Sequence, residues 1–132
     1  FLREIMEHKV WTSDKINNLA PGQQCTENIF LFTEAQSIDF EEDATILCRT
    51  ADNKEVVCHF DVDPRTSGLK ELHSGDIVAI RNAVVGDGAS EDFTDPNLVN
   101  NYLGIVEETT IYRYFDNHKK QWLTSPQSIL SV

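Results

Sequence analysis

Hydrophobic and polar residues alternate along several short stretches of this 132-residue chain, and turn-forming residues separate these stretches. Alternation with a period of two is typical of a β-strand that buries one of its faces. The pattern predicts strands over residues 27–36, 44–50, 55–62, 77–80 and 102–115. We expect the last of these to bend near Gly104 or Glu107, because both positions interrupt its apolar pattern.

The segments that join the predicted strands have patterns of their own. Asp52 and Asn53 indicate a hairpin turn between the second and third strands. Residues 66–73 carry Leu69 and Leu72 at helical spacing, and Gly75 follows at the expected helix end. This connector is therefore predicted to be a short helix that closes the bottom of a barrel.

Both ends of the chain are predicted to be extensions of the central sheet. Residues 2–10 space their apolar side chains as a short amphipathic helix does, and Thr12 is placed to cap the turn that follows. Near the other end, Ser125 and Pro126 indicate the start of a short C-terminal helix.

This order of elements fits an OB-fold, a five-stranded barrel with a short helix between its third and fourth strands. A chain of 132 residues is long enough for one hydrophobic core, so we expect a single domain. Its N-terminal extension would cover residues 1–24, the barrel 25–115 and the C-terminal extension 116–132. Such barrels bind single-stranded nucleic acid, oligosaccharide or another protein.

Alternation in the central hairpin separates a core face from an outer face. We assign to the core Ala44, Ile46, Cys48, Val56, Cys58 and Phe60. Cys48 and Cys58 are expected to lie opposite each other, where a cross-strand disulfide is conceivable but reduced, buried thiols are favoured. The three cysteines match no zinc-binding spacing, so the sequence predicts no metal site and favours an intracellular protein.

Acidic residues outnumber basic ones by 22 to 11, which gives a formal net charge of -11. This balance disfavours a non-specific nucleic-acid binder, whose affinity depends on neutralising phosphates. Specific binding to a single strand remains possible, because each base stacked on an aromatic ring contributes about 1–3 kcal/mol. The cations available for such a site include Arg81 and a predicted hairpin patch that consists of Arg49, Lys54 and His59.

The richest aromatic cluster lies near the end of the predicted fifth strand. Tyr112 and Tyr114 share a strand face and are placed to sandwich bases against Arg113 or against the hairpin. The alternative is that these rings cover the barrel edge and pack against Trp122.

The stretches Ile16–Leu19, Asn28–Gln36, Thr45–Phe60 and Leu72–Ile80 resemble, in order, the OB-fold of protection-of-telomeres proteins. The resemblance implies binding of single-stranded telomeric DNA in the nucleus, with bases stacked on aromatic residues and no cofactor. It also implies a stacking role for Phe60, whereas alternation places this ring in the core. The chain departs from the family pattern in its loops, which are acidic but contain Phe40 and Phe93.

Two other functions compete with single-strand binding. The acidic loops around Glu41 and Asp92 favour a scaffold that contacts basic proteins in a telomere or replication complex. The same acidic clusters suit Mg²⁺ in an enzyme, but no nucleophile or phosphate-binding loop accompanies them, so we predict that the chain is not an enzyme. No apolar run approaches the roughly 18 residues of a membrane span, so no membrane partner is predicted.

Overall fold

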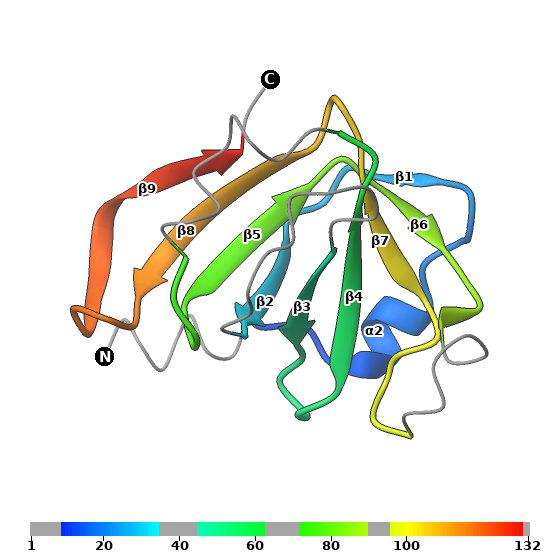
Figure 1. Cartoon of the computed structure of the whole chain (residues 1–132), viewed down its shortest axis with the longest axis horizontal. Coiled ribbons are helices and arrows are strands. Elements are labelled where there is room, and N and C mark those ends of the chain that lie inside the picture. Colours follow the sequence, from blue (N-terminus) through cyan, green and yellow to red (C-terminus); the bar gives the residue numbers. More distant parts are fainter. Residues whose placement is uncertain (1–8, 35–44, 63–71, 90–95, 131–132) are drawn as a thin grey trace.

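A computed structural model describes residues 9–34, 45–62, 72–89 and 96–130, which fold mainly as β-structure (Figure 1). The elements are α2 (Ser13–Asn17), β1 (Gln24–Cys25), β2 (Ile29–Thr33), β3 (Thr45–Arg49), β4 (Glu55–Phe60), β5 (Ile77–Arg81), β6 (Ala83–Gly86), β7 (Tyr102–Ile105), β8 (Thr110–Asp116) and β9 (Gln121–Leu130).

In the described part of the chain, nine strands form one curled sheet in the order β1-β6-β7-β4-β3-β2-β5-β8-β9, which has the shape of a half-barrel. Each neighbouring pair is antiparallel except β4 and β7, which are parallel. The prediction of a mainly β, barrel-like fold is therefore confirmed in this coarse form. The predicted count of five strands is wrong.

The predicted fifth strand is divided into β7 and β8, and β6 follows β5 in a stretch where the sequence predicts no strand. Asn82, with a φ of 65°, separates β5 from β6 and turns the chain between two distant places in the strand order. The predicted bend near Glu107 separates β7 from β8, and the Thr109 hydroxyl closes it by accepting a 2.9 Å hydrogen bond from the Val106 N–H. The sheet is thus forced to curl at both breaks.

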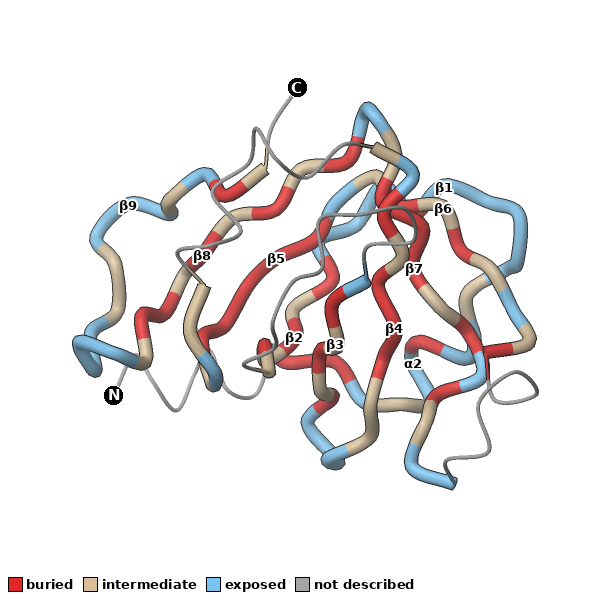
Figure 2. Tube along the Cα trace, in the orientation of Figure 1, coloured by how far each residue is buried: buried red, intermediate tan, exposed pale blue. Residues whose placement is uncertain are grey.

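The main core lies inside the curled sheet and draws on α2 and on each of the described strands (Figure 2). The predicted core face of the central hairpin is confirmed at Ile46, Cys48, Val56, Cys58 and Phe60, all at most 6% exposed, while Ala44 lies outside the described residues.

The register of the hairpin corrects the predicted cysteine alignment. Cys48 pairs with Val56 and Cys58 with Ile46, so the two thiols are diagonal neighbours with their sulfurs 3.9 Å apart. The hairpin is centred on Asp52, one residue earlier than the predicted centre at Asn53. All three cysteines are buried and free, as expected, and the thiol–thiol contact together with burial raises the pKa of Cys58.

A second, smaller apolar cluster covers the opposite face of the sheet. Val10 packs there on Ile77 and Phe115, and the half-buried rings of Phe30 and Phe32 lie against this cluster. The N-terminal segment therefore crosses the outer face of β2 and β5.

The C-terminal extension is a strand, not the predicted helix. β9 pairs with β8 at Gln121 and Trp122 and again from Gln127 to Leu130, with irregular register between, and the Trp122 ring packs on Phe115 with 4.9 Å between ring centroids. Pro126 lies in this irregular stretch of β9, the last strand of the row among the described residues, where a proline is tolerated.

Other predictions are confirmed or lie outside the described residues. Thr12 caps α2 as predicted, accepting a hydrogen bond from the Lys15 N–H. The predicted helices over 2–10 and 66–73 lie wholly or largely in undescribed stretches, as do Phe40, Phe93 and both acidic loops. None of the described helices is long and apolar enough to cross a bilayer.

Candidate nucleic-acid interface

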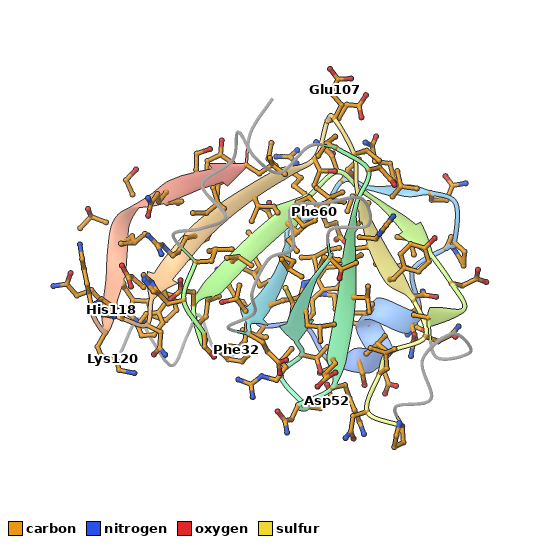
Figure 3. All side chains as sticks on the ribbon, in the orientation of Figure 1. Phe32, Asp52, Phe60, Glu107, His118 and Lys120 are labelled. Atoms are coloured by element: carbon orange, nitrogen blue, oxygen red, sulfur yellow. The ribbon has the colours of Figure 1, made fainter. Side chains whose placement is uncertain are left out.

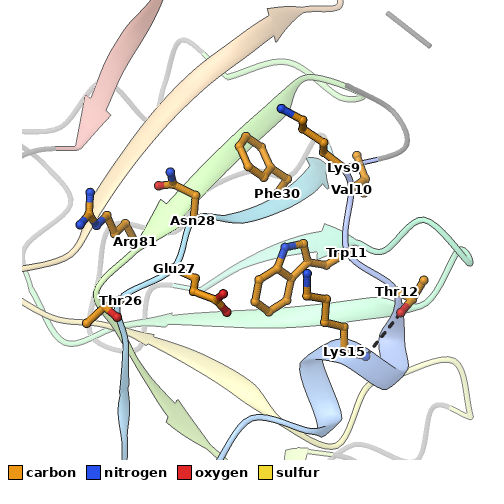
Figure 4. A pocket seen from close by; sticks show the side chains of 10 residues that line it. All are labelled: Lys9, Val10, Trp11, Thr12, Lys15, Thr26, Glu27, Asn28, Phe30 and Arg81. Carbon is orange, nitrogen blue, oxygen red and sulfur yellow. Dashed lines mark hydrogen bonds between the residues drawn. The ribbon is translucent and has the colours of Figure 1, made fainter. Parts of the chain in front are cut away.

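A cavity of about 700 Å³ opens between the N-terminal segment, α2 and the start of β2. We name it the Lys15 pocket. It is lined by Lys9, Val10, Trp11, Thr12, Lys15, Thr26, Glu27, Asn28, Phe30 and Arg81 (Figure 4).

The wall that carries Trp11 is fixed by backbone hydrogen bonds on both sides. The Trp11 N–H donates to the Phe30 carbonyl at 2.9 Å, and the Trp11 carbonyl accepts from the Ala51 N–H at 2.9 Å. The indole is 5% exposed and packs into the main core. Trp11 therefore anchors the N-terminal segment to β2 and to the hairpin turn.

α2 holds Lys15 over this wall. The helix is tied to the hairpin tip because Ser13 donates from its N–H and its hydroxyl to the Asp52 carboxylate, at 2.8 and 2.5 Å. Although slight burial raises the pKa of Asp52, these bonds lower it to about 2. The Lys15 ammonium consequently lies 4.2 Å from the centre of the Trp11 ring, a cation–π contact.

The charge of the pocket is opposite to that of the whole chain. Lys9, Lys15 and Arg81 are exposed cations, and Glu27 is the one acidic side chain among the described residues that line the pocket. Figure 4 shows Arg81 and Thr26 at one end and Thr12 at the other, with Glu27 between them. A chain with a formal charge of -11 thus gathers three cations at one cavity.

Rings and small polar groups complete the lining. Phe30 is half-buried and meets Tyr114 edge to face, with ring centroids 5.3 Å apart. Asn28 and Thr26 are exposed beside it and offer an amide and a hydroxyl. An aromatic face beside hydrogen-bonding groups and cations suits a planar base attached to a phosphate.

The predicted hairpin patch is offset by neighbouring carboxylates. Arg49 Nε lies 3.2 Å from Glu34 Oε1, and His59 Nε2 lies 3.5 Å from Asp61 Oδ1. Lys54 is half-buried in the hairpin turn, where its backbone pairs with Thr50. These three residues do not line the Lys15 pocket, so the structure does not join them to Arg81.

Phe60 lies in the core, 6% exposed, and is labelled among the sheet strands in Figure 3. Burial leaves its ring without an open face, in agreement with the alternation and not with the role that the resemblance implies. Tyr112 and Tyr114 are half-buried on one face of β8, and Tyr114 reaches the pocket only through Phe30.

Arg113 lies inside the molecule and cannot sandwich a base. Its guanidinium is 3.1 Å from Asp76 Oδ2 and 3.9 Å from Asp116 Oδ2, and it donates to Gln127 Oε1 on β9. Burial raises the pKa of Asp116, but N–H donors of Lys119 and His118 and the Arg113 charge hold it below its usual value. The buried Arg113 side chain of β8 therefore connects Asp76, directly before β5, with Gln127 of β9.

His73, Asp76 and Asp116 also offer ligand atoms that lie within 4.8 Å of one another, a spacing compatible with a metal ion. The Arg113 guanidinium lies 3.1 Å from Asp76 Oδ2 and 3.5 Å from His73 Nδ1. A positively charged group of the protein is therefore already in contact with these ligand atoms. The donor set therefore fits an internal ion pair better than a cation site.

The sequence predicts Arg81 as a binding residue but not the other residues of the Lys15 pocket. Its pattern places Lys9, Trp11 and Lys15 in an N-terminal extension, and Phe30 on a strand packed on both faces. One signal was present in the sequence: Lys9, Trp11 and Lys15 gather two cations and a ring within seven residues of an acidic chain.

Searches of protein-family models, of curated proteins and of solved structures find no match to this chain.

Proposed function

We propose that this chain binds single-stranded nucleic acid through the Lys15 pocket. The observation that carries the proposal is the meeting of Lys9, Lys15 and Arg81 with Phe30 at one cavity. In this proposal the cations contact phosphates, the exposed part of the Phe30 ring stacks on a base, and Asn28 bonds to a base edge.

The strand order supports a finer assignment of the fold as an OB-fold. Strands β5, β2, β3 and β4 lie side by side, so the fourth of them along the chain lies beside the first, which is a Greek-key order. β7 then lies beside β4. An OB-fold is a partly open Greek-key barrel that binds oligonucleotides.

The resemblance to telomere end-binding proteins narrows the proposed ligand to telomeric single-stranded DNA and the proposed location to the nucleus. No catalytic role is proposed, since the cations and rings of the Lys15 pocket suit binding, and no nucleophile paired with a base lies among its lining residues.

The proposal is tested by titrating labelled telomere-repeat DNA, scrambled DNA and the matching RNA with the protein. The double variant Lys15→Ala/Arg81→Ala should bind the telomere-repeat strand at least about tenfold more weakly, because two phosphate contacts are lost. Lys119→Ala/Lys120→Ala is the charge-matched control, since both lysines are exposed at the β8–β9 turn (Figure 3). Equal losses in the two variants, or no binding by the native chain, would overturn the proposal.

A protein scaffold is the second candidate, and the net charge of -11 favours it. A basic partner protein would bind to the acidic surface of the chain and would not contact the Lys15 pocket. Reversal of Glu41, Glu42 and Asp43 to Lys should then abolish capture of a basic telomere or replication protein, while Lys15→Ala/Arg81→Ala leaves it intact. The opposite result would favour the nucleic-acid function.

A further inference from the structure

A second cavity, of about 340 Å³, shares strand β2 with the Lys15 pocket and lies over the small apolar cluster on the outer face of the sheet. Phe32, Arg49 and Asn53 contribute to its wall, and Ile77 and Phe115 to its apolar floor. We name it the Phe32 pocket. Figure 3 shows Phe32 at the end of β2 next to β3.

The two pockets repeat the same three chemical groups. The Lys15 pocket has the ring of Phe30, the guanidinium of Arg81 and the amide of Asn28. The Phe32 pocket has the ring of Phe32, a guanidinium and an amide, from Arg49 and Asn53. A ring, a cation and an amide are the groups that a nucleotide engages through its base face, phosphate and base edge.

The spacing of the two rings matches neighbouring nucleotides. Phe30 and Phe32 lie on the same face of β2, which alternates half-buried and buried residues, so they are about 6.6 Å apart along the strand. Bases on an extended single strand are splayed farther apart than the 3.4 Å rise of a stacked strand, so two rings at this spacing can each take one base. Both rings pack against the small apolar cluster that contains Val10, Ile77 and Phe115.

We propose that the Phe32 pocket is a second subsite, which binds the nucleotide next to the one held in the Lys15 pocket. This inference rests on the proposed single-strand function and adds the path of the ligand along β2. Arg49 is the directly opposite cross-strand neighbour of Phe32, so its guanidinium is placed beside a base stacked on that ring.

Glu34 regulates the strength of this subsite. Its carboxylate lies 3.2 Å from Arg49 Nε and is itself partly exposed, so it competes with a phosphate for the guanidinium. Glu34→Gln should therefore strengthen binding at the Phe32 pocket. Glu107→Gln is the charge-matched control, because Glu107 is exposed in the β7–β8 turn (Figure 3) and is not among the described residues that line either pocket.

The experiment compares a mononucleotide, a dinucleotide and longer telomere-repeat strands on the native chain and on Phe32→Leu, which keeps apolar volume but removes the ring. The native chain should gain affinity from mononucleotide to dinucleotide, and Phe32→Leu should lose about 5- to 150-fold on the dinucleotide and the longer strands but not on the mononucleotide. Photoactivated 5-iodouracil at adjacent positions should crosslink to Phe30 from one position and to Phe32 from the next.

The outcomes separate this inference from the proposed function. If Lys15→Ala/Arg81→Ala abolishes binding while Phe32→Leu binds every length as the native chain does, the second subsite is overturned and the Lys15 pocket stands. If the native chain binds no oligonucleotide, both the proposed function and the second subsite are overturned. Equal gains for Glu34→Gln and Glu107→Gln would show a general charge effect and would overturn the role of Glu34.

Discussion

Arg81 and Arg113 lie on the neighbouring strands β5 and β8, but their surroundings differ completely. Arg81 is exposed at the Lys15 pocket, whereas Arg113 is 5% exposed and paired with Asp76. A buried charge that loses its partner is strongly destabilising, while an exposed one is already solvated. At the scale of single residues, one arginine is therefore available to a ligand and the other stabilises the sheet.

Substituting each arginine by methionine should separate these roles. Arg113→Met leaves the buried Asp76 carboxylate without its counter-ion and should lower the free energy of unfolding by about 3–5 kcal/mol. Arg81→Met should change stability by less than about 0.5 kcal/mol but weaken oligonucleotide binding. Denaturant unfolding measures the first effect and titration the second. Equal stability of the two variants would contradict the assignment.

The lowered pKa of Asp116 makes stability depend on pH in the acid range. A carboxyl group with a lower pKa in the folded state stabilises the protein above its unfolded pKa, near the ordinary 3.8, and this contribution is lost as pH falls through the folded pKa. Asp116→Asn should therefore be less stable than the native chain at about pH 6 and approach it in strong acid. A constant difference down to the lowest pH would contradict the expectation.

At the scale of elements, the passage from β5 to β6 decides the shape of the sheet. Asn82 alone separates the two strands, with a left-handed φ of 65°. Its carbonyl accepts hydrogen bonds from the Gln24 amide and the Thr109 hydroxyl, and its N–H donates to the Cys25 carbonyl. All these bonds use the backbone, so the side chain can be exchanged without removing any of them.

Substitutions at Asn82 should thus report backbone strain alone. Asn82→Val places a β-branched residue at a positive φ and should destabilise the fold by about 1–2 kcal/mol. Asn82→Gly, which accepts this conformation freely, should stay close to the native stability. Thermal unfolding of the pair measures the difference, and equal melting temperatures would show that the turn relaxes.

At the scale of the whole molecule, periodicity predicted the core because side chains alternate regularly within each strand. Ile46, Cys48 and Phe60 were found in this way. The pocket was not predictable, since Lys15 meets Arg81 only after the N-terminal segment crosses β2. The prediction of a C-terminal helix is wrong for a similar reason. Pairing of β9 with β8 and the Phe115–Trp122 contact outweigh the local helix signal of Ser125 and Pro126.

The distribution of charge predicts how salt affects ligand binding. With three cations at the Lys15 pocket and Arg49 at the Phe32 pocket, the slope of log affinity against log salt should be no steeper than about -3, because each phosphate contact on a single strand contributes about 0.7. Titrations over a series of potassium chloride concentrations measure it. A slope near -5, on the order of seven contacts, would place most of the ligand elsewhere.

Pro126 also has a consequence for self-association. β9 is ten residues long and ends the row of strands in the described part of the chain, which is the geometry that invites edge-to-edge aggregation. A proline halfway along interrupts the ladder of amide donors that an incoming strand would need. Pro126 is thus expected to disfavour the addition of a further strand to this edge, and with it the growth of fibrils.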